Sequence, residues 1–267
     1  MRNGTTEEHY LSVESEDLQI AFNCNRIWAH TYRETKIETM KNLDLSGDET
    51  VLDVGCGQGY LLKLMNETHP GIVSVGLDVN LVDLKKARRR NSMQSNCEFV
   101  LGDAGSLPFK DGAFEAISCT AVLEHVSDEK KVMHQIWRTL KKNGKAVIDV
   151  PGAFHLQNKL SDLFIKSQGV FPFHREYTTG RMNALIKECG FRLESFSSTR
   201  FVGSLLLPVV ETAATVSGRK IVWCRNTFAR IICWGGDRIS SLCGQRSYLK
   251  LLGGSWLFKL RRQNLQL

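Results

Sequence analysis

Hydrophobic residues along the chain follow two patterns that alternate from about residue 50 onward. Short apolar runs, typical of buried strands, are followed by segments in which apolar residues recur every three or four positions, typical of helices. The strand-like runs cover residues 51–54, 72–77, 113–119, 145–150, 191–196 and 255–260, with one more before Asp103. This alternation predicts a largely parallel sheet covered by helices on both faces, which is an α/β fold.

Capping residues mark the predicted helices. Residues 28–43 carry an amphipathic pattern before the first strand, and three residues, Asn80, Ser127 and Thr178, are expected to cap the helices that follow them. Gly190 is expected to end the last of these helices. The side chains expected to face the core are Leu81, Leu84, Ala87, Val132, Met133, Ile136, Trp137, Leu140, Met182, Leu185, Ile186 and Cys189.

The last part of the chain has a different organisation. Roughly fifty residues separate the sixth predicted strand from the last one, far more than an ordinary loop, so they should carry structure of their own. Apolar residues at 201–210 and 221–234 indicate two helices, and we expect a helical insertion near the sheet edge. The expected divisions are an N-terminal helical segment at 1–48, a core at 49–200, the insertion at 201–254, and a final strand and tail at 255–267.

Charge is unevenly distributed along the 267-residue chain. Residues 191–267 carry a net charge of +9 and residues 1–190 a net charge of −2, within a formal total of +7. The basic region holds three of the five tryptophans, a combination compatible with contact with an anionic membrane surface. Packing of these tryptophans against the sheet edge or against another subunit is the alternative. The basic residues at 85–90 are interpreted as a solvated helix face.

The cysteines and the first residues of the chain give an expectation about the cellular compartment of the protein. The eight cysteines are scattered without a C-x-x-C pair, so neither a disulfide framework nor a zinc site is expected. The first residues are polar and lack the apolar core of a signal peptide. No apolar run reaches the ~18 residues of a spanning helix. We therefore expect a cytoplasmic protein, with the basic C-terminal region as the candidate for peripheral contact at the inner membrane surface.

A glycine-rich stretch follows the first strand-like run. Gly55, Gly57 and Gly59 stand at alternate positions, a pattern typical of a strand that turns sharply into a helix and lets a ligand lie against bare backbone. The spacing differs from the dinucleotide-binding G-x-G-x-x-G, because Tyr60 stands where the third glycine would be. Asp53, just before the turn, disfavours a pyrophosphate and is compatible with a cationic or zwitterionic ligand.

A carboxylate follows the second strand-like run. Asp78 lies nineteen residues after Gly59. An acidic side chain at the tip of a neighbouring strand can accept hydrogen bonds from both ribose hydroxyls of a nucleoside. The glycine turn and Asp78 together predict a site for a nucleoside-bearing cofactor.

Three stretches resemble one known family. Residues 51–60, Asp103 within 99–109, and the sequence Leu-Glu-His-Val at 123–126 resemble class I S-adenosylmethionine-dependent methyltransferases, in particular the subgroup of quinone-biosynthesis methyltransferases. The resemblance covers about residues 50–200, with the motifs in the family's order. It implies a Rossmann-like sheet of seven mostly parallel strands, an antiparallel last strand, and S-adenosyl-L-methionine as the cofactor.

The resemblance also implies the contacts that the cofactor makes. The backbone at Gly55 and Gly57 would approach its amino-acid end, Asp78 would hold the ribose, and Asp103 would bind the adenine amine. For Asp53, a structural hydrogen bond to the turn and a water-mediated ligand contact are both open. The expected cofactor-binding residues are Asp53, Gly55, Cys56, Gly57, Asp78, Asp103, Ala104 and Cys119.

Histidines are the candidates for a proton acceptor. His125 follows the fourth predicted strand, where the family's acceptor approaches, and is the first candidate for a catalytic residue. His155 and His174 are further candidates, and for each histidine a hydrogen bond to a neighbouring loop is the structural alternative. Some quinone O-methyltransferases bind a divalent cation through a glutamate where this chain has Ala121, so we expect no metal.

The favoured function is methyl transfer by in-line displacement to a small or amphipathic acceptor that is lipid-, quinone- or glycan-like. Methylation of RNA or DNA is one alternative, supported by the basic tail. Against it, the segment after the fourth strand lacks the Asp/Asn-Pro-Pro-aromatic sequence that grips a flipped base, and Cys119 has no neighbouring proline. A non-catalytic cofactor-binding scaffold is the other alternative.

Overall fold

The computed structural model describes residues 26–153, 175–199 and 255–263. Helices and strands alternate along the chain, as the hydrophobic pattern predicted. The elements are α2 (Arg26–Leu43), β1 (Thr50–Val54), α3 (Tyr60–Thr68), β2 (Val73–Asp78), α4 (Leu81–Arg90), β3 (Cys97–Leu101), β4 (Phe114–Thr120), α5 (Glu129–Thr139), β5 (Leu140–Pro151), α7 (Thr179–Glu188), β6 (Phe191–Thr199) and β7 (Ser255–Arg262).

The strands form one seven-stranded sheet in the order β3-β2-β1-β4-β5-β7-β6. The pairs from β3 to β5 are parallel, whereas β7 runs antiparallel between β5 and β6. This confirms the predicted mostly parallel sheet and its antiparallel last strand. The chain builds outward from β1 to β3 and then returns to place β4 on the other side of β1. In open α/β sheets, ligands bind at such a reversal, beyond the carboxyl ends of the strands.

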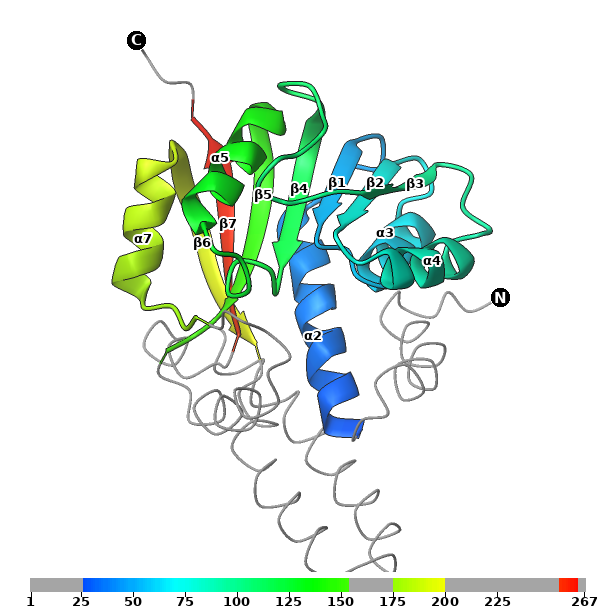
Figure 1. The fold of residues 1–267 in the computed structure, drawn as a ribbon, viewed down its shortest axis with the longest axis horizontal. Helices are drawn as coiled ribbons and strands as arrows, with labels where there is room; N and C mark the ends of the chain where they lie inside the picture. Colours follow the sequence, from blue (N-terminus) through cyan, green and yellow to red (C-terminus); the bar gives the residue numbers. More distant parts are fainter. Residues whose placement is uncertain (1–25, 154–174, 200–254, 264–267) are drawn as a thin grey trace, which may run out of the picture.

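Side chains alternate between two cores, one on each face of the sheet. In β1, Leu52 and Val54 pack with α5 and α7, whereas Val51 packs with α2, α3 and α4. The strand period of two produces this division, because successive side chains point to opposite faces. Figure 1 shows the helices distributed over the two faces, with α2 extending beyond the carboxyl ends of the parallel strands. Both faces are therefore covered, as the strand pattern predicted.

Two of the three predicted helix caps are confirmed. The Asn80 side chain accepts hydrogen bonds from the N–H groups of Val82 and Asp83, and Thr178 accepts one from the N–H of Arg181. The prediction for Ser127 is wrong by one residue, because the Asp128 carboxylate accepts from the N–H of Lys131. Either side chain can cap, and only the backbone path into α5 selects Asp128.

Two side chains predicted to be part of helical core faces differ from expectation. Leu81, at the first position of α4, is 51% exposed. Leu140 is buried as predicted, but it begins β5 rather than ending α5. Gly190 has a φ of 76° directly after α7, which confirms the predicted helix end.

Some expectations fall on residues outside the described ranges. These are the helical insertion at 201–254, His155, His174 and two of the three tryptophans of the basic region, which therefore stay predictions. Within the described ranges, none of the helices has the length and apolar character needed to cross a membrane.

Candidate functional site

The glycine turn lies at the carboxyl end of β1. All three glycines have positive φ angles: 71° at Gly55, 52° at Gly57 and 75° at Gly59. Other residues adopt this region only with strain, so the alternate glycines let the chain reverse immediately after the strand. The N–H groups of Gly55 and Cys56 both donate to the carbonyl oxygen of Leu77, at 2.7 and 3.0 Å. The turn is thereby held against the end of β2.

The three glycines face different surroundings. A Cβ atom on Gly55 would lie 2.2 Å from Cγ2 of Val122, so the loop after β4 packs directly on this glycine. A Cβ on Gly59 would lie 2.8 Å from Nδ2 of Asn91, at the end of α4. At Gly57 a Cβ would meet no atom of the described residues within 4 Å. Gly57 therefore offers open backbone, at which a ligand can lie.

Asp78 is joined to the turn by a direct hydrogen bond. Its Oδ2 accepts from the N–H of Gly57 at 2.7 Å, and its Oδ1 accepts from the N–H of Asn80 at 2.8 Å. The residue is partly exposed. A carboxylate has about four lone-pair positions, so both oxygens can accept further bonds from a ligand. Asp78 thus lies beside the open backbone, with oxygens that can accept hydrogen bonds from a ligand there.

Asp103 follows β3, the next strand of the sheet. It is exposed, and its Oδ1 accepts a hydrogen bond from the N–H of Gly105 at 2.8 Å. The preceding Gly102 donates its N–H to the carbonyl oxygen of Asp78 at 3.0 Å, which ties the two loops together. Ala104 is 9% exposed and belongs to the core. Asp78 and Asp103 therefore lie on connected loops at the same edge of the sheet.

Asp53 is buried at the end of β1, with 1% of its surface exposed. Its Oδ1 accepts a hydrogen bond from the hydroxyl of Ser118 at 2.7 Å. Its Oδ2 has no hydrogen-bond partner within the described part of the chain. Burial raises the pKa of the Asp53 carboxyl, while the charge of Lys36 and the Ser118 bond oppose this. One oxygen thus bonds to Ser118 of β4, not to the glycine turn as the structural alternative expected, and the other can accept a bond from a ligand.

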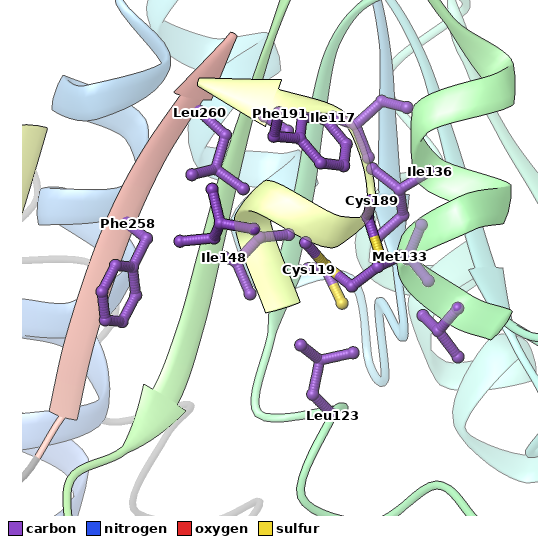
Figure 2. Packing of buried hydrophobic residues seen from close by; sticks show 14 of the residues in the cluster. Ile117, Cys119, Leu123, Met133, Ile136, Ile148, Cys189, Phe191, Phe258 and Leu260 are labelled. Atoms are coloured by element: carbon purple, nitrogen blue, oxygen red, sulfur yellow. The ribbon is translucent and has the colours of Figure 1, made fainter. Parts of the chain in front are cut away.

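The two cysteines in the predicted site are both buried. Cys56 is 5% exposed and lies within the turn, where burial raises the pKa of its thiol. Cys119, which was expected near the methionine part of the cofactor, has no exposed surface. Figure 2 shows it within the core, together with Leu123 and Met133. Alternation along β4 causes this, because Cys119 points to the face opposite to that of Ser118. The structure therefore does not support Cys119 as a direct cofactor contact.

His125 lies in the loop after β4. Its side chain is 27% exposed, and its Nε2 is 4.0 Å from Oε1 of the buried Glu124. The backbone N–H of His125 donates to the carbonyl oxygen of Val122 at 2.9 Å. Since Val122 packs on Gly55, the loop that carries His125 is adjacent to the glycine turn. This position is compatible with contact with an acceptor molecule.

The loop after β4 is held by two residues that the sequence did not single out. Nη1 of Arg175 donates to the carbonyl oxygen of Val126 at 2.6 Å, and its Nη2 donates to that of Ser127 at 2.7 Å. The hydroxyl of Tyr177 lies 3.0 Å from the carbonyl oxygen of Leu123. Both come just after a histidine that was considered for catalysis, but only the fold brings them to this loop.

Arg90, at the end of α4, also contributes to the site, which corrects its interpretation as a solvated residue. Its Nη1 donates to the carbonyl oxygen of Gln58 at 2.6 Å, and its Nη2 donates to the hydroxyl of Tyr60 at 2.7 Å. The guanidinium carbon lies 3.6 Å from the centroid of the Tyr60 ring. Tyr60 stands where a dinucleotide-binding site has its third glycine. This difference was the only feature of the sequence that drew attention to the position that Arg90 contacts.

The described ranges contain no group of three or more His, Cys, Asp or Glu side chains that could hold a metal ion. The glycine turn, the unpaired oxygen of Asp53 and the carboxylate of Asp78 instead favour an organic ligand.

A family model described as a methyltransferase domain matches residues 52–148, from β1 into β5. Over these residues the chain is therefore a methyltransferase domain. This confirms the resemblance that the sequence motifs indicated. The matched residues include the glycine turn, Asp78, Asp103 and His125.

Curated relatives of the methyltransferase domain include quinone-pathway enzymes. Demethylmenaquinone methyltransferase of Lactococcus lactis is 31% identical over 132 residues, which cover 48% of this chain and 49% of that protein. The Thermotoga maritima enzyme of the same name is 29% identical over 165 residues, which cover 54% of this chain and 71% of that protein. A ubiquinone/menaquinone biosynthesis C-methyltransferase of Desulfotalea psychrophila is 33% identical over 101 residues, covering 38% and 41%. The chain thus spans about half the length of the Lactococcus relative.

Solved structures show the same fold as the methyltransferase domain. A putative methyltransferase in complex with the Haloferax volcanii Trm112 activator has a TM-score of 0.62 at 18% identity, covering 89% of this chain and 90% of that one. A geranyl diphosphate methyltransferase in complex with SAM has a TM-score of 0.61 at 14% identity, covering 89% of each chain. At these identities the similarity establishes the Rossmann-like fold only.

Proposed function

We propose that the protein transfers the methyl group of S-adenosyl-L-methionine to a small, quinone-like acceptor. The observation that carries the proposal is the open backbone at Gly57 with the carboxylate of Asp78 bonded to it, together with Oδ2 of Asp53, which has no hydrogen-bond partner among the described residues. These groups fit a ligand that has a cationic amino-acid end and a nucleoside end. The quinone-like acceptor is supported by the names of the curated relatives.

Each end of the cofactor has its own residues in this proposal. Asp53 accepts a bond from the amino group directly or through a water, and the bare backbone at Gly55 and Gly57 admits the amino-acid chain. Asp78 accepts bonds from the ribose hydroxyls, and Asp103 binds the adenine amine. Cys56 and Ala104 border the site through their backbone, because their side chains are buried.

Bound S-adenosylmethionine supplies a methyl group that is electrophilic because of the adjacent sulfonium. The acceptor provides the electron pair of the new bond to carbon, the pair of the sulfur–methyl bond passes to sulfur, and the acceptor loses one proton. The protein aligns the reacting atoms and excludes water. We assign the proton transfer to His125, whose partly exposed ring lies in the loop that packs on the turn.

The test begins with calorimetric titration of S-adenosylmethionine into the full chain, which should show binding at one site. The protein is then incubated with methyl-labelled S-adenosylmethionine and a reduced 1,4-naphthoquinone that lacks the ring methyl group. We expect labelled product whose mass has increased by one CH₂ group. His125→Gln should lower the turnover and leave the affinity for S-adenosylmethionine unchanged. Absence of binding by the wild type would contradict the proposal.

Cell extract separates the alternatives. Label in the lipid and small-molecule fraction supports the proposal, and label in RNA or DNA instead would identify a nucleic-acid methyltransferase. Binding of S-adenosylmethionine without a methylated product in any fraction would favour a scaffold.

We also propose a cytoplasmic location with peripheral membrane contact through the predicted insertion at 201–254. Its support is the net charge of +9 over residues 191–267, which would attract anionic lipid. Sedimentation with vesicles of anionic lipid should carry the protein down at low salt and release it at high salt. Vesicles of neutral lipid serve as the control, and equal sedimentation with both would contradict an electrostatic contact.

A further inference from the structure

The loop after β4 is held on both sides of His125 by one short segment, residues 175–177, which lies just before α7. The backbone of this segment runs beside the carboxyl end of β5. The N–H of Tyr177 donates to the carbonyl oxygen of Pro151 at 3.0 Å, and the N–H of Ala153 donates to that of Tyr177 at 2.9 Å. The segment is therefore attached to the sheet by backbone bonds of its own.

Arg175 contacts four backbone carbonyl oxygens of the loop, two before His125 and two after it. In chain order these oxygens belong to Leu123, Glu124, Val126 and Ser127. The backbone N–H of Arg175 donates to the second of them at 3.2 Å. Nitrogen atoms of the guanidinium lie 3.5, 2.6 and 2.7 Å from the other three. Because the planar guanidinium presents its N–H groups in a fixed fork, these bonds set the direction of the loop as well as its distance.

Glu129, the first residue of α5, holds the guanidinium of Arg175 in place. Its side chain is 12% exposed, and its Oε2 lies 3.6 Å from Nη1 of Arg175. The same oxygen lies 2.7 Å from the hydroxyl of Tyr177, and Oε1 accepts a bond from Nη2 of Arg181 at 2.8 Å. Arg175 is thereby fixed through its backbone at one end of the residue and through a carboxylate at the other.

The loop needs such support, because it begins with a strained residue. Ala121 has a φ of 57°, a left-handed conformation that costs a residue with a Cβ about 1–2 kcal/mol. A conformation of this kind persists only where the surrounding structure determines it. The next residue, Val122, packs on Gly55 of the glycine turn. Release of the loop at Arg175 would therefore allow His125 to move relative to the turn.

We propose that Arg175 is a positioning residue for methyl transfer, which holds the loop so that the ring of His125 stands at a fixed distance from the bound acceptor. This inference rests on the proposed function, in which His125 takes the proton of the acceptor. A proton acceptor works only within hydrogen-bond reach of its proton, and a misplacement of about 1 Å costs up to about a hundredfold in rate. Loss of the Arg175 bonds should therefore lower the turnover and leave the binding of S-adenosylmethionine at the glycine turn largely unchanged.

The test compares Arg175→Lys, which keeps the positive charge but cannot bond to several carbonyl groups at once, with Arg138→Lys. Arg138 makes bonds of the same kind at another place, to the carbonyl oxygens of Leu107 and Phe109 at 2.9 and 2.8 Å, before β4. Turnover is measured at saturating concentrations of S-adenosylmethionine and of an acceptor that the wild type methylates. We expect Arg175→Lys to lose about tenfold in turnover, with an affinity for S-adenosylmethionine within about twofold of the wild type. Arg138→Lys should lose stability and keep the turnover of the wild type.

A cycle with His125→Gln separates positioning from a purely structural role. Because Arg175 is proposed to act through His125, Arg175→Lys should change the turnover by less than about twofold once His125 has been replaced. An equal loss in the two backgrounds would overturn the inference. It would also be overturned by an unchanged turnover of Arg175→Lys, or by equal losses in Arg175→Lys and Arg138→Lys.

Failure of the wild type to bind S-adenosylmethionine or to methylate any acceptor would instead overturn the proposed function. If Arg175→Lys does not fold, as judged by thermal unfolding, Glu129→Gln provides the second test. It removes the carboxylate beside Arg175 and keeps an oxygen for the hydroxyl of Tyr177. It should lower the turnover about threefold or more with His125 present and less than about twofold with His125→Gln, and equal losses would refute the inference.

Discussion

The backbone N–H of Gly57 donates a 2.7 Å hydrogen bond to Oδ2 of Asp78. This bond joins two motifs that are 21 positions apart in the chain and that were recognised separately in the sequence. In addition to the ribose contact that we propose for it, Asp78 therefore holds the open part of the glycine turn in place. Any change at Asp78 should affect both ends of the cofactor site.

Replacement of Asp78 by Ala should weaken the affinity for S-adenosylmethionine by about tenfold to a hundredfold, because ligand bonds and the bond to Gly57 are lost together. Asp83→Ala is the matched control, since Asp83 lies on the same side of the sheet but bonds only to Asn80 and Lys86 among the contacts identified. Calorimetric titration of both variants measures the difference. Equal affinities would refute the role assigned to Asp78.

Gly55→Ala should destabilise the protein by about 2–4 kcal/mol, the sum of a left-handed backbone conformation and overpacking against Val122. The added Cβ would lie 2.2 Å from Cγ2 of Val122 at a φ of 71°. Gly57→Ala should cost less, because only the backbone conformation is unfavourable there. In a Gly55→Ala/Val122→Ala double variant the clash is removed, so the two substitutions should cost less together than the sum of their separate costs. Urea denaturation of the four variants checks this, and additive costs would show that the clash is absent.

Arg90→Lys should loosen the glycine turn even though the positive charge is kept. A lysine cannot bond to Gln58 and Tyr60 at once and stack on the Tyr60 ring, as the guanidinium does. We expect a loss of about 1–2 kcal/mol in the free energy of unfolding. The exposed neighbour Arg89 provides the control, and Arg89→Ala should change stability by less than about 0.5 kcal/mol. The prediction fails if the two variants unfold at the same denaturant concentration.

Glu49 should contribute stability at neutral pH that disappears in acid. Burial alone would raise its pKa, but the N–H groups of Ser46 and Gly47 donate to its carboxylate at 2.7 and 2.8 Å, and the net result is a pKa below the ordinary 4.5. A carboxyl group with a lowered folded pKa stabilises the protein above its unfolded pKa and loses this effect as pH falls through the folded value. Glu49→Gln should therefore cost about 1–2 kcal/mol at pH 7.

The same substitution should cost progressively less as the pH falls through the lowered folded pKa of Glu49, because the carboxyl then becomes protonated in both the folded and the unfolded state. Denaturation of the wild type and the variant at pH 7 and at a series of acidic pH values measures this difference. Asp48→Asn, at the exposed neighbouring residue, should show no comparable change. A constant cost of Glu49→Gln over this pH range would contradict the hydrogen-bonding role.

Tyr177→Phe should loosen the loop that carries His125. The Tyr177 side chain is buried. Its hydroxyl lies 2.7 Å from Oε2 of Glu129 and 3.0 Å from the carbonyl oxygen of Leu123. Its removal should cost about 1–3 kcal/mol, since a partly buried carboxylate oxygen of Glu129 loses a donor. Hydrogen exchange at residues 121–127 should accelerate, whereas exchange in α3 should not. Unchanged exchange in the loop would show that Tyr177 does not hold it.

Several parts of the fold were predictable because their signals are local. The strand at the glycine turn, the cap at Asn80 and the helix end at Gly190 each depend on residues within a few positions of one another. The cap of α5 shows the limit of this reasoning. Ser127 and Asp128 are both good capping residues, and the packing of the chain before the helix decides between them.

The candidate site was predictable only in part. The glycines, Asp78 and Asp103 follow predicted strands, and Asp53 lies near the end of one, so their place at one edge follows from the parallel sheet itself. Cys119 was assigned by its nearness to that edge, but its direction depends on the face to which β4 turns each side chain. A shift of one residue along a strand exchanges the side chains of its two faces. Around residue 119 the side chains are apolar or small on both faces of the strand.

The amino-acid sequence by itself determined the alternation of strands and helices, the sharp turn at the three glycines and the acidic residues at the strand ends, because periodicity and turn chemistry act over short distances. Only the tertiary structure decided that Lys36 meets Thr120, 84 positions away, and that Arg90 stacks on Tyr60. Such contacts depend on which strands become neighbours and on how helices pack across them. Packing is a property of the whole chain, and no local pattern specifies it.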